Sequence, residues 1–343
     1  MNKIPKGEGL TFHIIFTQGT VRHLRLFTLS LLKWLPCSFR LVANGCEPKE
    51  TEMLEQFCQC HPRLEFFPLS VEDRHTHADA LNVLQQRETS PYFCFMDSDI
   101  LATGPFLQEI LPLMQDYCAV FSGRPIWLEK GHNVMPTGSN DGKRFRGHYN
   151  LAHDGWVPGS SFFAIYDNIT LNQFIADTGI GFNRYNWQRI PEQYHALLEK
   201  AKLKFERYDT AKVLNLLLQL RGETMCYIEP DGLAHLGGFS SLTLAYLPVP
   251  IKRRIKNLIK KVIYLFSASD RKSLSEKEDK DGNQGRTTIK PMINRYYIEY
   301  LHALFEDLPL PMLPALESSP VKKEVEALTH SINQYYHEFK TQL

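Results

Sequence analysis

The chain has 343 residues, of which 43% are hydrophobic and 22% charged, and its formal net charge at pH 7 is +1. This length and composition are typical of a globular protein with one large domain and a smaller trailing element. A charge so near neutrality argues against a protein built for bulk nucleic-acid binding, so we expect no nucleic-acid partner.

The first hundred residues alternate short apolar runs with stretches of helical periodicity. The apolar runs predict strands over 11–17, 39–43, 64–69 and 92–96. The stretches between them predict helices over 23–35, 49–60 and 77–88. Strand and helix repeated in this order favour an α/β fold with a doubly wound parallel sheet.

The rest of the chain is less regular. Residues 129–155 show no periodicity and are rich in Gly, Asn, His and Asp, which is typical of a functional or mobile segment. Charged residues 267–290 are typical of a flexible linker. Further strands are predicted over 119–122, 161–166 and 226–229, and further helices over 191–204, 210–221, 296–304 and 321–340.

Polar residues follow three of the predicted strands, at 17–20, 44–47 and 97–99. In open α/β sheets, ligands bind beyond the carboxyl ends of the strands. The third of these turns, Asp97-Ser98-Asp99, places two carboxylates at the end of a buried strand. Carboxylates are hard ligands for a divalent cation that also binds a diphosphate. The alternative is an ordinary polar turn, because Asp and Ser are common turn residues.

Five segments in this order resemble the nucleotide-diphospho-sugar glycosyltransferases of the GT-A fold, near glycosyltransferase family 2. They are His77-Ala78-Asp79-Ala80-Leu81-Asn82, Asp97-Ser98-Asp99, Val157-Pro158-Gly159-Ser160-Ser161, Tyr208-Asp209-Thr210 and His235-Leu236-Gly237-Gly238. The resemblance implies a Rossmann-like mixed sheet flanked by helices over 8–247, with a helical C-terminal appendage over 248–343. It also implies sugar transfer from a nucleotide-diphosphate sugar, with a UDP-sugar favoured, to an acceptor that the sequence does not identify.

The resemblance further implies a metal and donor site. Asp97, Asp99 and His235 would ligate Mn²⁺ or Mg²⁺, with Asp97 acting through water or binding the ribose instead. The residues implied to contact the donor nucleotide and its diphosphate are Thr17, Gln18, Asn44, Asp79, Asp97, Ser98, Gly237 and Gly238. For each of the first four, turn chemistry or a solvated helix position remains an alternative.

The acceptor side is implied by two segments. Trp156, Gly159, Ser160 and Ser161 would line the sugar and acceptor, although tryptophans at such positions also serve as core residues. Asp209 would be the catalytic base of an inverting displacement. Tyr208 stands where the family commonly has Glu, which leaves retention or inversion open. Asp209, or Thr210, also fits an N-cap of the helix that follows.

Residues 251–266 form a basic amphipathic stretch, with apolar positions on one helix face and cations opposite. The stretch fits peripheral binding to an anionic membrane, and it equally fits packing on the main domain with solvated lysines outside. The polar N-terminus has no apolar segment, and cysteines such as Cys94 and Cys226 lie in apolar runs, so we expect buried thiols and a cytoplasmic location.

Two other functions fit parts of this pattern. A nucleotidyltransferase on a similar sheet would normally carry a Gly-rich basic loop after the first strand, and residues 17–22 are a poor match to such a loop. A non-catalytic GT-A-like binding protein would need neither the acidic pair nor His235. The sequence therefore favours the transferase.

Overall fold

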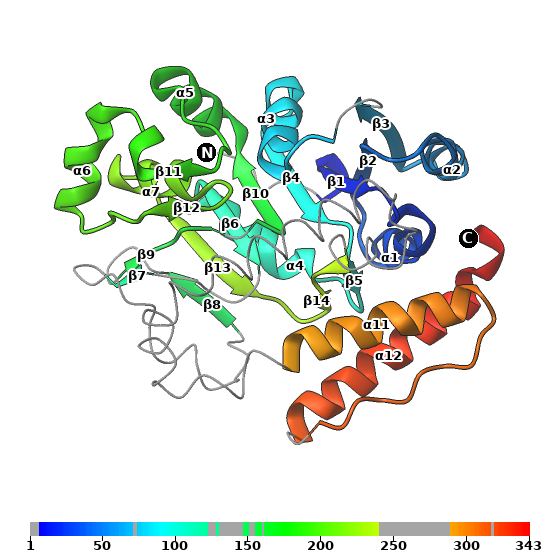
Figure 1. The fold of residues 1–343 in the computed structure, drawn as a ribbon. Coiled ribbons are helices and arrows are strands. Elements are labelled where there is room, and N and C mark those ends of the chain that lie inside the picture. Colours follow the sequence, from blue (N-terminus) through cyan, green and yellow to red (C-terminus); the bar gives the residue numbers. More distant parts are fainter. Residues whose placement is uncertain are drawn as a thin grey trace, which may run out of the picture. The chain divides into compact units, whose positions relative to one another are not determined.

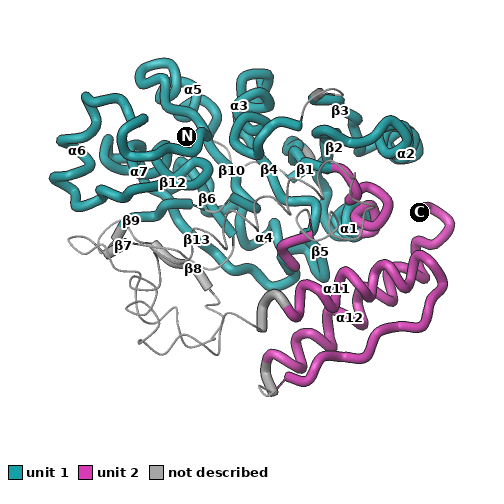
Figure 2. The backbone as a smooth tube through the Cα atoms, in the orientation of Figure 1, with its two compact units in different colours: residues 1–17, 27–235 teal, residues 18–26, 236–343 magenta. Residues whose placement is uncertain are grey.

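The computed structural model describes residues 7–70, 74–122, 128–129, 147–150, 155–159, 161–239, 289–316 and 319–343. The chain divides into two compact units, the first made of Met1–Thr17 and Phe27–His235 and the second of Gln18–Leu26 and Leu236–Leu343 (Figure 2). Within the described ranges, no helix combines the length and the apolar character needed to cross a membrane.

The first unit is built on an eight-stranded sheet in the order β3-β2-β1-β4-β10-β6-β13-β8 (Figure 1). The strands are β1 (Thr11–Thr17), β2 (Ser38–Asn44), β3 (Leu64–Ser70), β4 (Tyr92–Asp97), β6 (Ala119–Ser122), β8 (Gly147–Asn150), β10 (Phe163–Asp167) and β13 (Met225–Glu229). Strands β1 to β4 pair in parallel, β10 is antiparallel to both β4 and β6, β13 is parallel to β6, and β8 is antiparallel to β13.

The sheet is therefore mixed, and the doubly wound parallel arrangement holds only for its first half. The strand predicted over 161–166 is where the wholly parallel expectation is wrong, because β10 returns antiparallel beside β4. Helices flank the sheet: α1 (Val21–Trp34), α2 (Pro48–Gln59), α3 (His77–Arg87), α4 (Leu107–Ile110), α5 (Asn168–Thr178), α6 (His195–Lys200) and α7 (Lys212–Leu220). This mixed sheet with flanking helices and a helical C-terminal region confirms the predicted fold class.

Apolar side chains cover both faces of the central strands β1, β4 and β10. Phe12 packs on Phe163 with ring centroids 5.5 Å apart, and Phe163 packs in turn on Phe106 at 6.0 Å. On the other face Phe182 lies 6.0 Å from the ring of Phe95. Because aromatic side chains bury large areas in defined geometries, they hold β4 rigidly between its neighbours.

Three two-stranded ribbons complete the first unit. They pair β5 (Ile100–Ala102) with β14 (Leu233–His235), β11 (Tyr185–Asn186) with β12 (Arg207–Tyr208), and β7 (Leu128–Glu129) with β9 (Gly155–Trp156). Each ribbon has only two or three residues per strand, which is too short for apolar periodicity to reveal it in the sequence. The β5–β14 ribbon positions the site described below.

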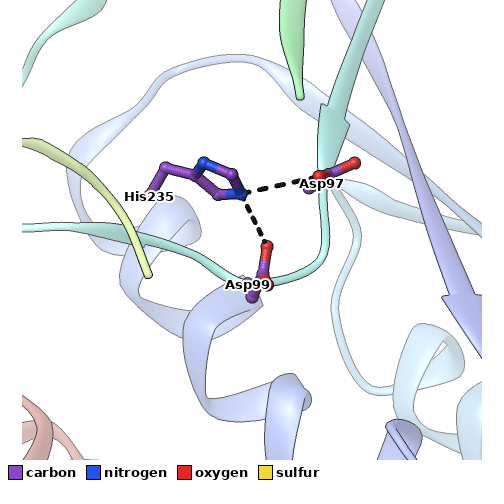
Figure 3. Close-up of side chains that lie close together, drawn as sticks. All are labelled: Asp97, Asp99 and His235. Atoms are coloured by element: carbon purple, nitrogen blue, oxygen red, sulfur yellow. Dashed lines mark ion pairs between the residues drawn. The ribbon is translucent and has the colours of Figure 1, made fainter. Parts of the chain in front are cut away.

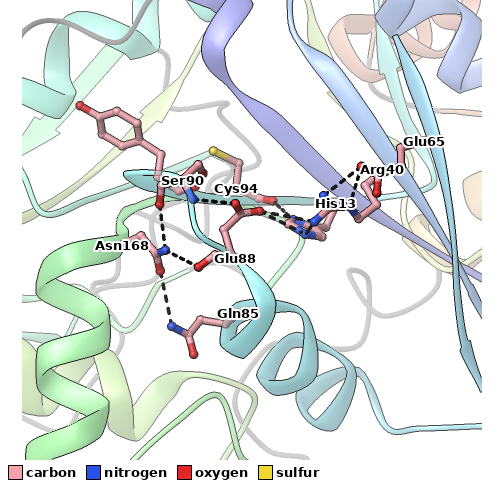
Figure 4. Close-up of polar contacts among 9 residues, drawn as sticks. His13, Arg40, Glu65, Gln85, Glu88, Ser90, Cys94 and Asn168 are labelled. Carbon is pink, nitrogen blue, oxygen red and sulfur yellow. Dashed lines mark hydrogen bonds and ion pairs between the residues drawn. The ribbon is translucent and has the colours of Figure 1, made fainter. Parts of the chain in front are cut away.

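A buried polar network ties the middle of the sheet to the end of α3 (Figure 4). The His13 Nδ1 atom donates to the Cys94 carbonyl at 3.0 Å, and Arg40 donates to Nε2 at 3.0 Å. Arg40 also pairs with Glu65 at 2.9 Å and lies 3.6 Å from Glu88. Burial lowers the pKa of His13, and the Arg40 guanidinium lowers it further, so the imidazole is neutral.

The second unit pairs α11 (Ile289–Phe305) with α12 (Ser319–Phe339), and the first turn of α1 packs with them. The ring of Phe305 lies 5.2 Å from Tyr336 and 5.0 Å from His23, and Arg22 forms an ion pair with Glu306. Both predicted C-terminal helices are present and begin earlier than expected. Residues 251–266 and 267–288, with their membrane and linker interpretations, lie outside the described residues.

Candidate metal centre

The acidic pair lies in the turn between β4 and β5. Strand β4 ends at Asp97 and β5 begins at Ile100, so Ser98 and Asp99 form the link between two buried strands. The Asp97 side chain is 37% exposed, whereas that of Asp99 is 8% exposed. Burying a carboxylate without compensation is costly, so its surroundings must supply positive charge or hydrogen bonds.

The β5–β14 ribbon brings His235 to these carboxylates. In its antiparallel register His235 lies opposite Ile100, the residue directly after Asp99. The His235 Nε2 atom is 3.5 Å from an oxygen of Asp97 and 3.2 Å from an oxygen of Asp99 (Figure 3). The pairing of two three-residue strands thus brings His235 to an acidic pair that lies more than 130 positions earlier in the chain.

The three side chains fit a divalent cation. Each offers one ligand atom, and these atoms all lie within 4.8 Å of one another. Neighbouring ligands of an octahedral cation bound at about 2.1 Å are roughly 3 Å apart, close to the two distances from Nε2. Two carboxylates with one imidazole suit Mn²⁺, and Mg²⁺ less well, because nitrogen ligation favours the softer ion.

The electrostatics of His235 show the surplus of negative charge at this point. Burial of the ring opposes its protonation, but hydrogen bonds and attraction from Asp97 and Asp99 outweigh burial and raise its pKa to about 9. The proton on the imidazole therefore occupies the position between the carboxylates that suits a metal ion. Binding of a cation there would displace this proton.

Two residues near the cluster were not predicted as site residues. The ring of Phe162 stacks on His235, and the Nε2 atom of His77 lies 3.9 Å from an oxygen of Asp97. The resemblance covered His77 as the first residue of its segment but gave it no role. Nothing in the sequence pattern pointed to Phe162, because its contact depends on the β10 and β14 pairings.

Several of the predicted nucleotide residues already use their polar atoms in hydrogen bonds within the protein. Thr17 and Asn44 end β1 and β2 and are buried. The amide group of Asn44 donates to the His75 carbonyl at 3.0 Å and accepts from the His75 N–H at 2.9 Å. Asp79 accepts from the Thr76 hydroxyl at 2.6 Å at the start of α3. Direct donor contacts by these residues stay predictions.

Gln18, Gly237 and Gly238 belong to the second compact unit. Gly237 and Gly238 follow His235 along the chain, and both have a positive φ, at 72° and 82°. Two consecutive left-handed residues turn the backbone sharply after His235, which is compatible with amides that bind phosphate oxygens. Their role in donor binding stays a prediction.

The predicted acceptor loop is anchored to α7. Trp156 is partly buried against the core, as its alternative interpretation holds, and Ser161 is half-buried. Gly159 has a φ of 79°, and a Cβ there would lie 2.1 Å from the Asn215 side chain, so only glycine fits. Ser160 lies outside the described residues.

Asp209 is exposed and does not cap α7. The helix begins at Lys212, and its N-cap is Ala211, whose φ is 64° and whose side chain makes no capping bond. The N-cap alternative for Asp209 or Thr210 is therefore wrong. The Asp209 carboxylate accepts from the Thr210 N–H at 2.9 Å and pairs with Arg184 at 3.0 Å. These contacts do not join it to the metal centre.

No protein-family model and no curated protein match this chain. It resembles solved glycosyltransferase structures at 12–15% sequence identity. The mannosyltransferase PcManGT from Pyrobaculum calidifontis, in complex with GDP-Man and Mn²⁺, is 15% identical, with 50% of this chain and 47% of that chain covered and a TM-score of 0.37. The glycosyltransferase GlyE of Streptococcus pneumoniae TIGR4 is 12% identical, with 64% and 45% covered and a TM-score of 0.33.

GalNAc-T7, with UDP, GalNAc and Mn²⁺, is 13% identical, with 88% of this chain and 58% of that chain covered and a TM-score of 0.41. The chain thus spans about half the length of these three structures. They name the same class of enzyme as the sequence resemblance does. At such TM-scores, the function has to be argued from the residues of this chain.

Proposed function

We propose that this protein is a metal-dependent glycosyltransferase that moves a sugar from a nucleotide-diphosphate sugar to an acceptor nucleophile. The observation that supports this most is the convergence of Asp97, Asp99 and His235 at the carboxyl end of β4. That edge of a sheet is where α/β proteins bind phosphorylated ligands.

Each member of the cluster has a defined part in the proposal. Asp99 is buried and His235 is held by β14, so these two side chains ligate the cation directly. Asp97 is more exposed and is free to share its oxygens between the cation, a water molecule and the donor. When bound, Mn²⁺ would neutralise the charge that develops on a departing diphosphate.

Asp209 is the proposed catalytic base. In an inverting transfer, the acceptor oxygen forms a bond to the anomeric carbon while the bond from that carbon to the diphosphate oxygen breaks. The acceptor proton passes to a carboxylate, for which the exposed Asp209 is available. Arg184 pairs with this carboxylate at 3.0 Å. The favoured donor is a UDP-sugar.

A panel of nucleotide sugars tests the proposal. The protein should be stabilised against heat by one donor only when Mn²⁺ is present, and slow hydrolysis of that donor should release a nucleoside diphosphate. Release of pyrophosphate would instead show a nucleotidyltransferase. A protein that neither binds nor turns over any donor with Mn²⁺ would be a binding module, and the proposed activity would be wrong.

Replacement of Asp209 tests the base. Asp209→Asn should fold and bind the donor normally but turn over about 100-fold more slowly, because the amide cannot accept the proton. Asp177 is a matched control, since it is also an exposed carboxylate paired with an arginine, Arg221, at 3.1 Å. Asp177→Asn should leave turnover unchanged. Normal turnover by Asp209→Asn would remove Asp209 from the mechanism.

A further inference from the structure

Phe162 lies directly against the imidazole of the metal centre. The two rings are nearly parallel, with centroids 4.0 Å apart and an interplanar angle of 15°. The lone pair of an imidazole nitrogen lies in the plane of the ring, so the tilt of the ring decides where that lone pair points. A flat aromatic face beside His235 therefore fixes the direction in which Nε2 binds.

The backbone of Phe162 also holds the other side of the centre. Its carbonyl accepts from the Asp97 N–H at 2.7 Å, and the next residue, Phe163, pairs with Met96 in the sheet. One residue thus contacts two of the three proposed ligands, the first through its main chain and the second through its ring. A change in its position would alter the spacing between Asp97 and His235.

Phe162 is anchored on its C-terminal side by β10 and on its N-terminal side by α7. Three residues on one face of α7, spaced three and four apart, donate to three consecutive carbonyls of the preceding loop. The bonds are Lys212 to Gly159 at 2.6 Å, Asn215 to Pro158 at 2.9 Å and Gln219 to Val157 at 2.7 Å. Residues 157–159, shortly before Phe162, are therefore fixed to a buried helix.

The stacking of Phe162 on His235 takes the place of the hydrogen bond that usually orients a metal-binding histidine. A metal-binding histidine commonly donates its second ring nitrogen to a carboxylate or carbonyl, which fixes the orientation of the ring. In the part of the chain that the structure describes, the Nδ1 atom of His235 has no such hydrogen bond. On the side of the imidazole away from the carboxylate contacts of Nε2, the Phe162 ring is therefore available to orient it.

We propose that Phe162 is a positioning residue of the metal centre, which aligns the His235 imidazole through its ring and the Asp97 backbone through its carbonyl. The inference rests on the proposed function, because it presupposes that Asp97, Asp99 and His235 bind a cation. It assigns the ring of Phe162 to metal affinity.

The test is a titration of the full-length protein with Mn²⁺ alone, followed by calorimetry. Phe162→Leu, which removes the flat face, should bind Mn²⁺ about 10-fold more weakly, while Phe162→Tyr, which keeps it, should bind within about threefold of the unmodified protein. Phe162→Met provides a second non-aromatic variant if the leucine variant does not fold. Thermal melting of each metal-free variant separates loss of affinity from loss of structure.

Phe163 provides the matched control. It is adjacent in sequence and fully buried, but its ring packs on Phe12 and Phe106 on the opposite face of the sheet. Phe163→Leu should lower the melting temperature and leave Mn²⁺ affinity unchanged. A purely structural role for Phe162 would give the same pattern as Phe163.

Two results would contradict the inference, and they differ in whether the metal centre itself is also wrong. If the unmodified protein binds Mn²⁺ and Phe162→Leu binds it equally well, the positioning role is wrong and the metal centre stands. If the unmodified protein binds no Mn²⁺, the metal centre and the proposed function are both wrong, and the positioning role is wrong with them.

Discussion

His13 is buried and His235 is partly buried in the first unit, and their charges differ. His13 is fully buried, and its pKa is lowered because burial and the nearby Arg40 disfavour a second positive charge. The His235 ring is also disfavoured by burial, but two carboxylates raise its pKa to about 9. Burial acts in the same direction on both rings, so the neighbouring charges decide the outcome.

The difference separates a structural cluster from a binding site. Around His13, the guanidinium of Arg40 already lies among the carboxylates of Glu65 and Glu88, and the imidazole only accepts and donates hydrogen bonds. Around His235, two carboxylates converge on one imidazole, whose proton a metal ion can replace. A local surplus of negative charge, and not burial alone, distinguishes His235 from His13 and supports the proposed metal site.

Removal of Asp99 is expected to have the largest effect on metal binding by the His235 cluster. Asp99→Ala should weaken Mn²⁺ binding by more than about 100-fold and abolish metal-dependent turnover, because a buried ligand is lost outright. Mn²⁺ titration by calorimetry and donor turnover check both effects. Asp167→Ala is a control, since that carboxylate caps α5 by accepting from the Thr170 N–H at 2.7 Å. Unchanged Mn²⁺ affinity in Asp99→Ala would remove Asp99 as a ligand.

Replacing His13 should affect stability and nothing else. His13→Leu leaves the Arg40 guanidinium and the Cys94 carbonyl without their partner, at a cost of about 2 kcal/mol in the free energy of unfolding. Denaturant unfolding with EDTA present measures this loss. Mn²⁺ affinity of the variant should equal that of the unmodified protein. A large change in Mn²⁺ affinity would show that the two clusters are coupled.

In metal-free protein, His13 and His235 should make opposite contributions to the pH dependence of folding stability. His235 has a pKa of about 9 when folded and an ordinary value of 6.5 when unfolded, so the folded state binds more protons between these values. Its stabilising effect is fully present below pH 6.5 and is lost as the pH rises through 9, with a slope of at most about 1.4 kcal/mol per pH unit.

The stability difference between the unmodified protein and His235→Gln, measured with EDTA from pH 6 to 10, reports this loss. The difference should shrink as the pH rises. A difference that stays constant over this range would mean that His235 is not charged in the folded protein.

For His13 the sign of the pH effect on stability is reversed. Its folded pKa lies below 6.5, so below that pH the unfolded chain binds the extra proton and stability falls as the pH falls. His13→Leu should therefore lose stability less steeply than the unmodified protein between pH 6.5 and 5. Equal slopes in the two proteins would show that His13 is protonated in both states or in neither.

The sequence predicted the first four strands and the acidic turn because apolar runs and turn residues are local features. It also predicted His235 beside the acidic pair, although only through the family resemblance. The pairing that brings them together, β5 with β14, involves three residues on each strand and leaves no periodic pattern. Without that pairing, the position of Phe162 against His235 could not be foreseen.

Other expectations failed for local reasons. The helix predicted from Thr210 begins at Lys212 because Ala211 takes a left-handed conformation, which is uncommon for a residue other than glycine. The family resemblance implied that Asn44 and Asp79 contact the donor, and this stays a prediction. The sequence did not show that their side chains also bond to His75 and Thr76, partners that only the folded loop brings within reach.

Crystals grown with Mn²⁺ and a nucleoside diphosphate, with data collected at the manganese absorption edge, test the central claim most directly. The account predicts an anomalous peak about 2.2 Å from carboxylate oxygens of the acidic pair and from Nε2 of His235. A manganese ion bound elsewhere in the molecule, with the nucleotide beside it and the imidazole still hydrogen-bonded to the two carboxylates, would contradict it.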